Sequence, residues 1–269
     1  MRLYLLSAFL VSSIILIDAS PTDERQINWK YGGLSGPQRW GDLDPSFATC
    51  KTGRYQSPID ITRTSAKLVE NHPLQLKWHK EHLKNVTMVN NGHTLQINMP
   101  AENRVELKRE GVHYYLRQFH IHTPSEHHIN GRYYDAEVHL VMSDKDNEKY
   151  QVLGVLMGLS DEPSKFLQDI SSEHNIPDDA GQSILLHRIN LRALITEVDD
   201  FREYYSYEGS LTTPPCTEGV RWIVAKNPAK MTWRQLDDMR QGTHYNARYV
   251  QQGHKIKSTH RTRKNMKLF

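Results

Sequence analysis

Residues 118–122 read QFHIH, an alternating pattern typical of a strand that carries two histidines. Successive side chains of a strand point to opposite faces, so Gln118, His120 and His122 share one face and the two apolar residues point into packing. The pair of histidines alone indicates little. The chain has 15 histidines, and counting matches predicts about 0.8 His-x-His pairs by chance.

The neighbouring stretch, AEVHLV at residues 136–141, turns this pair into a candidate metal site. It places Glu137, His139 and Val141 on one face of a second strand, and an Asn-Gly turn at 130–131 would bring that strand beside the first. Three neutral imidazoles leave Zn²⁺ its full charge and an open position, where a bound water acquires a pKa of about 7. Gln118 and Glu137 are expected to accept hydrogen bonds from the ligands and fix their tautomers.

Strand-like alternation dominates the rest of the chain, which has no internal repeat or long linker after residue 20. We therefore expect one domain, residues 20–253, built as a sheet with short peripheral helices. Asn-Gly turn signals occur at 91–92 and 130–131. The predicted strands are 87–99, 112–122, 132–142, 151–159 and 220–225, and the predicted helices are 162–170 and 233–240.

Composition narrows the function classes. The chain has 269 residues, 38% hydrophobic and 24% charged, which indicates a globular protein rather than a disordered or fibrous one. Lys and Arg number 34 against 31 Asp and Glu. A surplus of +3 is too small to favour nucleic acid as a partner.

The N-terminus is typical of an exported protein. Residues 1–19 combine Arg2, an apolar run and a small residue, Ala19, and are interpreted as a signal peptide. The alternative, a membrane anchor, is disfavoured because the apolar run is shorter than a membrane-spanning helix and is interrupted by serines. The rest of the sequence contains no second apolar run, so no transmembrane anchor is predicted. We expect a secreted, extracellular protein. Residues 254–269 form a basic tail that is either a solvated end or a contact for acidic surfaces or matrix.

Export also bears on covalent modification. In an oxidising compartment, an even number of cysteines favours a disulfide between Cys50 and Cys216 over two unpaired thiols. Asn85 begins the sole glycosylation sequon, which is an acceptor only if it lies on the surface.

Several motifs together resemble the alpha-class carbonic anhydrases, a family of zinc lyases, over roughly residues 28–251. The resemblance implies a mainly β fold with short peripheral helices, in which a large twisted, mostly antiparallel sheet of about ten strands holds zinc at the bottom of a conical cleft. The sequence departs from the family pattern at Thr123-Pro124 and at Tyr249, and these departures concern the local shape of loops. The motifs are QFHIH at 118–122, SEH at 125–127, AEVHLV at 136–141, SLTTPP at 210–215, QSPID at 56–60, NNGH at 90–93 and WIV at 222–224.

The resemblance implies reversible hydration of carbon dioxide to bicarbonate by zinc-bound hydroxide. It assigns His120, His122 and His139 as zinc ligands. Thr212 would donate to Glu126 and orient the hydroxide, and Thr213 would line the same polar side. The apolar wall for carbon dioxide would comprise Val141, Val152, Leu211, Val220 and Trp222.

The resemblance also assigns groups away from the metal. His93 matches the proton-shuttle histidine, and Tyr31, Asn91 and Gln96 match positions near a water chain. The two cysteines match the disulfide of secreted members, which would anchor the threonine loop.

Two other functions compete with this interpretation. A cupin metalloenzyme also uses His-x-His followed by Glu, but tyrosines stand at 114 and 133 where its glycines are expected. A catalytically silent binding or matrix protein of the same fold is the stronger rival. Such a protein would normally have lost a ligand, and all three ligands are present here.

Overall fold

The computed structural model describes residues 28–80, 82–100, 104–171 and 176–253. The predicted signal peptide, 1–19, and the basic tail, 254–269, lie outside the described residues. Within these ranges, no helix is both long enough and apolar enough to cross a membrane.

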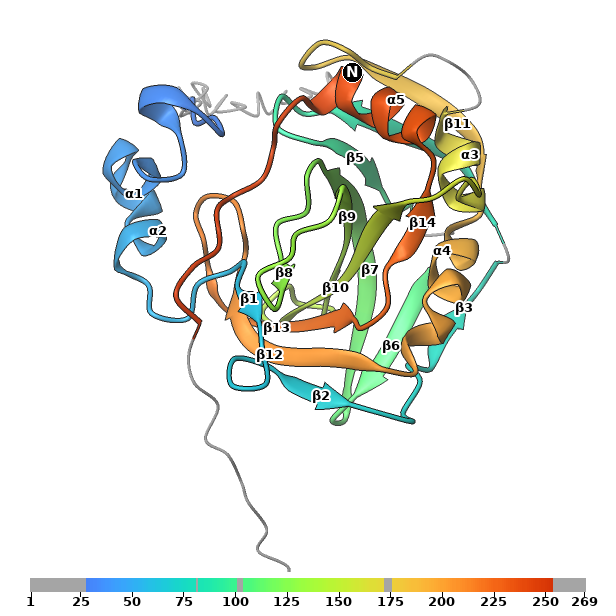
Figure 1. Ribbon diagram of the computed structural model, residues 1–269, viewed down its shortest axis with the longest axis horizontal. Helices are drawn as coiled ribbons and strands as arrows, with labels where there is room; N and C mark the ends of the chain where they lie inside the picture. Colours follow the sequence, from blue (N-terminus) through green and yellow to red (C-terminus); the bar gives the residue numbers. More distant parts are fainter. Residues whose placement is uncertain (1–27, 81, 101–103, 172–175, 254–269) are drawn as a thin grey trace, which may run out of the picture.

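Strands make up most of the secondary structure (Figure 1). They are β1 (Asp60–Ile61), β2 (Lys67–Val69), β3 (Leu76–Trp78), β4 (Leu83–Asn90), β5 (Leu95–Asn98), β6 (Val105–Arg109), β7 (Val112–His122), β8 (His128–Ile129), β9 (Ala136–Ser143), β10 (Tyr150–Leu159), β11 (Ser183–Ile189), β12 (Tyr204–Ser210), β13 (Glu218–Ala225) and β14 (Ala229–Met231). The α-helices are α1 (Trp40–Leu43), α2 (Thr49–Thr52), α3 (Lys165–Ser171), α4 (Leu191–Glu197) and α5 (Trp233–Thr243), and 3₁₀ turns are η1 (Gly33–Ser35), η2 (Pro45–Phe47) and η4 (Asp199–Phe201).

Twelve strands form one large sheet in the order β11-β4-β5-β7-β9-β10-β13-β12-β2, with β6, β3 and β14 attached beside that path. The long strand β7 pairs with β6 along its first half and with β5 along its second. Strand β10 likewise pairs with β13 and then with β14, and both of these pairs are parallel. The expected large, mostly antiparallel sheet is confirmed, with more strands than expected. Strands β1 and β8 form a separate parallel pair.

The two faces of the sheet pack differently. One face carries the larger hydrophobic cluster, to which α3, α4 and α5 contribute buried apolar side chains such as Phe166, Leu194 and Leu236. The other face carries a smaller cluster around Val152, Trp222 and the β1 strand. In Figure 1, α1 and α2 lie on the far side of the molecule from α3 and α4. The candidate functional site lies beside this smaller cluster.

A β-bulge in β7 sets which side chains face the site. The β7–β9 register shifts between Leu116 and Gln118, so Arg117 is the extra residue. Because of this shift, Leu116 and Phe119 both enter the larger cluster although they are three residues apart. The even-numbered residues after the bulge then point to the opposite face, as the sequence pattern predicts.

Several predicted boundaries need correction. Residues 87–99 form two strands, β4 and β5, because the Asn91-Gly92 turn interrupts them, with Gly92 at φ 85°. Strand β9 begins at Ala136 rather than at 132, since residues 130–135 are used to turn the chain. The predicted helix 162–170 begins only at Lys165, after the Ser164 hydroxyl accepts from the Leu167 N–H. Helix α5 extends beyond the predicted 233–240.

Candidate metal centre

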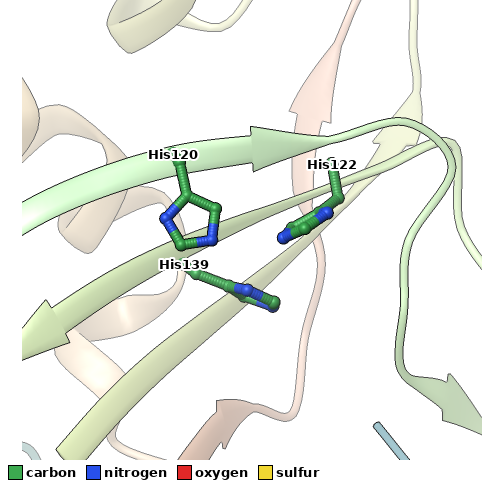
Figure 2. Close-up of side chains that lie close together, drawn as sticks. All are labelled: His120, His122 and His139. Atoms are coloured by element: carbon green, nitrogen blue, oxygen red, sulfur yellow. The ribbon is translucent and has the colours of Figure 1, made fainter. Parts of the chain in front are cut away.

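Three histidines from two adjacent strands converge on one point. His120 and His122 come from β7, His139 comes from β9, and His120 and His139 are direct cross-strand partners. Their ring centroids are 4.6 to 5.2 Å apart, and one nitrogen from each ring lies within 4.8 Å of the other two. Figure 2 shows the three rings turned toward one another. The predicted convergence is therefore present.

The outward nitrogen of each ring is held by a protein acceptor. His120 Nδ1 donates to Gln118 Oε1 at 2.8 Å, His122 Nδ1 to the Asn246 carbonyl at 2.7 Å, and His139 Nε2 to Glu137 Oε1 at 2.9 Å. These bonds fix the tautomers, so His120 Nε2, His122 Nε2 and His139 Nδ1 are left as lone-pair donors toward the centre. The structure thus places Gln118 and Glu137 where the sequence predicts acceptors.

The donor set fits a divalent metal. His122 Nε2 is buried and has no hydrogen-bond partner within the described residues, a costly arrangement unless a ligand occupies it. Burial lowers the pKa of His120 well below its ordinary value and that of His122 to about 4, and it also lowers the pKa of His139. Neutral imidazoles at pH 7 are what Zn²⁺ requires, and three of them leave a fourth position open.

Glu137 accepts hydrogen bonds from His139 and also from the neighbouring segment that contains Glu126 and His127. Its carboxylate accepts from the backbone N–H groups of Glu126 and His127 at 2.9 and 2.8 Å, and from His127 Nδ1 at 2.7 Å. Burial alone would raise the pKa of Glu137, but His127 and His139 together hold it well below the ordinary value. A buried carboxylate that is charged at neutral pH would make His139 a more electron-rich ligand for a metal.

Glu126 lies beside the ligands and is fully buried. Its Oε1 accepts from the Arg248 backbone N–H at 2.8 Å, and its Oε2 is 3.5 Å from His122 Nε2. Burial raises the pKa of Glu126 to about 7, opposed by His139, the Thr212 hydroxyl and the Arg248 N–H. Thr212 is itself buried, and Glu126 Oε2 is buried with no hydrogen-bond partner within the described residues.

A cavity of about 330 Å³ opens onto His120 and His139. One side is polar, with Gln118, Thr212 and Thr213, and the other is apolar. The predicted wall residues that line it are Val141, Val152, Leu211 and Trp222. Val220, also predicted for the wall, is fully buried in the smaller hydrophobic cluster and is not among the lining residues.

The predicted shuttle and water-chain residues lie on the β4–β5 turn, on β5 and in the N-terminal segment. His93 is half-buried and stacks on Trp29, with ring centroids 3.5 Å apart and an interplanar angle of 8°. Burial lowers the pKa of His93 below its ordinary value. Asn91 Nδ2 donates to Gln96 Oε1 at 3.2 Å, and the Tyr31 hydroxyl is buried without a partner among the described residues.

Some residues at the site were given no role there by the sequence analysis. The backbone carbonyl of Asn246 accepts a hydrogen bond from His122. Its side-chain amide donates to the Ile121 carbonyl on β7 and to the His93 carbonyl. It also accepts from the Thr123 N–H at 2.6 Å, which secures the unusual residue after the second ligand. The cavity lining also includes Arg117, Asn147 and Tyr150. Their nearness to the ligands depends on tertiary packing, so no local spacing signals it.

Cys50 and Cys216 form a disulfide, as predicted, with Cα atoms 5.0 Å apart. The bond joins α2 to the loop that follows Thr212 and Thr213. Gln56 Nε2 donates to the Cys216 carbonyl at 3.1 Å and strengthens the same junction.

Replacing both cysteines, Cys50→Ala with Cys216→Ala, is expected to lower the free energy of unfolding by about 5 kcal/mol, because the crosslink closes a very long loop. Urea unfolding of the variant against the parent measures this. The activity of the variant should also fall, since the Thr212 loop loses its anchor. An unchanged urea midpoint with both thiols absent would contradict the prediction.

A twisted sheet with three convergent, neutral histidines defines a class of β-sheet protein with a buried three-histidine metal site. The family model for eukaryotic-type carbonic anhydrase matches residues 35–267. A carbonic anhydrase of Pectobacterium carotovorum is 34% identical over 233 residues, covering 86% of this chain and 88% of the relative. This chain belongs to the alpha carbonic anhydrase family and is an enzyme of the carbonic anhydrase type.

Solved structures agree with that assignment. The alpha-carbonic anhydrase of Thermovibrio ammonificans, in complex with the inhibitor sulfanilamide, superposes with a TM-score of 0.74 at 39% identity, covering 84% of this chain and 96% of the other. Dioscorin complexed with ascorbate superposes with a TM-score of 0.72 at 28% identity, covering 86% of this chain and all of the other. The fold is therefore shared by proteins with different bound molecules.

Proposed function

We propose that this chain catalyses the reversible hydration of carbon dioxide to bicarbonate and a proton, with Zn²⁺ held by His120, His122 and His139. The observation that carries the proposal is the convergence of three tautomer-fixed, neutral imidazoles at the base of a cavity. When bound there, zinc would supply hydroxide at neutral pH by acidifying water.

Thr212 and Glu126 would orient the nucleophile. The Thr212 hydroxyl would donate to the carboxylate of Glu126, which would leave the Thr212 oxygen as an acceptor toward the cavity. That acceptor would set the direction from which a hydroxide supplied by bound zinc is presented to a substrate on the apolar side of the cavity.

The apolar wall suits carbon dioxide, which carries no charge and makes few hydrogen bonds. An apolar surface binds water weakly, so carbon dioxide could contact it without displacing tightly held water. The residues of this surface are Val141, Val152, Leu211 and Trp222. Bicarbonate, the charged product, is a poor fit for the same surface. The wall therefore favours the substrate over the product at the position next to the nucleophile.

Proton release would use His93. The ring lies on the turn between β4 and β5, and its backbone carbonyl accepts from the same Asn246 that orients the ligand His122. Tyr31, Asn91 and Gln96 would order water between the ring and the centre. An imidazole can exchange protons with buffer near neutral pH, which an unaided site does more slowly.

The variant His93→Ala is expected to turn over about tenfold more slowly in dilute buffer, because general acid–base groups typically contribute a factor of 10² or more and buffer replaces part of it. Added imidazole should restore the rate. Stopped-flow hydration across a buffer series measures both effects. His187→Ala, an exposed histidine on β11, serves as the matched control. Equal rates for His93→Ala and the parent in dilute buffer would refute the role.

The function itself is tested by stopped-flow carbon dioxide hydration before and after a chelator strips the metal, and again after zinc is restored. Fast hydration that is lost and then regained supports the proposal. A folded, zinc-loaded chain without hydration would instead favour a binding protein. The dioscorin–ascorbate structure makes that second candidate specific, and ascorbate titration of the same sample would test it.

Export and glycosylation are proposed on separate grounds. The disulfide supports an oxidising compartment, in keeping with the predicted signal peptide. Asn85 and Thr87 are both exposed on β4, which supports Asn85 as an acceptor. A mass shift removed by a glycosidase, and absent from Asn85→Gln, would test occupancy. The role of the basic tail stays a prediction.

A further inference from the structure

A second, smaller cavity lies on the other face of the sheet, back to back with the metal cavity. Val152 and Gln151 are neighbours on β10, so their side chains point to opposite faces. Val152 lines the metal cavity and Gln151 lines the second one. On β13, Trp222 likewise lines the metal cavity and its neighbour Arg221 lines the second one. Tyr150 borders both cavities, which places the two sites close together.

The second cavity presents two buried donors without acceptors. Gln151 is 1% exposed, and its Nε2 has no hydrogen-bond partner within the described parts of the chain. Arg109, at the end of β6, lines the same cavity with a buried Nη1 that likewise has none. An unpaired buried donor costs about 1–3 kcal/mol, so two at one cavity indicate that an acceptor from outside belongs there.

The charges around the cavity favour an anion as that acceptor. Arg221 also lines it and forms no ion pair within 4.0 Å among the residues that the structure describes, and Lys149 lies at its mouth. The carboxylates present are Glu110, whose side chain is 73% exposed and 3.9 Å from Arg109 Nε, and the exposed Glu208. Both carboxylates lie toward solvent, whereas the unpaired donors lie inside.

We propose that this cavity is a binding site for a small oxyanion, held by Arg109, Gln151 and Arg221. Its volume of about 190 Å³ admits an ion of phosphate or acetate size. Guanidinium groups present parallel N–H donors that match the paired oxygens of phosphate and carboxylate. None of these three residues has a role in the proposed hydration chemistry, so the proposal does not rest on that function.

Isothermal titration of the zinc-loaded chain with inorganic phosphate, at fixed ionic strength set by chloride, tests the site. Arg109→Met and Arg221→Met should each weaken binding at least tenfold. Arg192→Met, an exposed arginine on α4, should bind as the parent does. A parallel titration with acetate distinguishes a tetrahedral from a carboxylate ligand, and saturable binding of either supports the site.

The thermal unfolding midpoint serves as the check that each variant is folded. If Arg109→Met fails this check, the comparison rests on Arg221→Met and on Lys149→Met, whose side chain is exposed. The proposal is overturned if neither anion binds saturably to the parent, or if the folded variants bind like the parent. It is equally overturned if binding disappears when zinc is removed, because the anion would then occupy the metal cavity.

Discussion

Replacing His139 with alanine is expected to abolish zinc binding and to reduce carbon dioxide hydration to the uncatalysed rate. His139 is the ligand that β9 contributes, and its Nε2 is held by Glu137 at 2.9 Å. Without it, two imidazoles from β7 remain, which is fewer than the three protein ligands of a catalytic zinc site. Water that no metal acidifies has a pKa near 15.7 rather than about 7, so the loss should exceed about 10⁴-fold.

Zinc content by elemental analysis and stopped-flow hydration are measured on the same samples. His120→Ala and His122→Ala should behave alike, and His187→Ala should match the parent in both measurements. Because β9 is buried on both faces, thermal unfolding of each variant is recorded as well. A folded His139→Ala that keeps one zinc per chain and parent-like hydration would show that the metal lies elsewhere.

The site could be predicted from sequence only where its geometry is local. Strand alternation fixes that Gln118, His120 and His122 share a face, and a single antiparallel pairing then brings in His139. Asn246 contacts His122, and Arg248 contacts Glu126 beside it, each from more than 120 residues away. Their roles follow from how the segment after α5 crosses the sheet, and no periodicity in the sequence encodes that path.

The fold was predictable to a similar degree. Strand β7 has the predicted bounds, 112–122, because its alternation is strong and turns flank it. The bulge at Arg117 was not predicted, since only the partner strand β9 defines which residue is extra. Strands β2 and β14 have only three residues each, which is too short for a pattern of alternation to be recognised. The parallel pairing of β10 with β13 and β14 is likewise a property of the topology.

Replacing Thr212 with valine is expected to lower kcat/KM for carbon dioxide by about 10²-fold, since a misoriented nucleophile typically costs that much. Valine keeps the shape of threonine but has neither the hydroxyl donor to Glu126 nor the acceptor toward the cavity. The apolar wall and the three histidines are untouched, so zinc content should equal that of the parent. This separates the prediction for Thr212 from the prediction for His139.

Thr212→Ser is the matched control, because serine retains the hydroxyl and loses only a methyl group. It should keep hydration within a few-fold of the parent, while Glu126→Gln should fall with Thr212→Val, since an amide presents the hydroxyl with a donor as well as an acceptor. Thr212 is anchored by the Cys50–Cys216 disulfide nearby, so unfolding midpoints are compared for all variants. If Thr212→Val, with full zinc content, hydrates carbon dioxide as fast as Thr212→Ser, the hydroxyl has no orienting role.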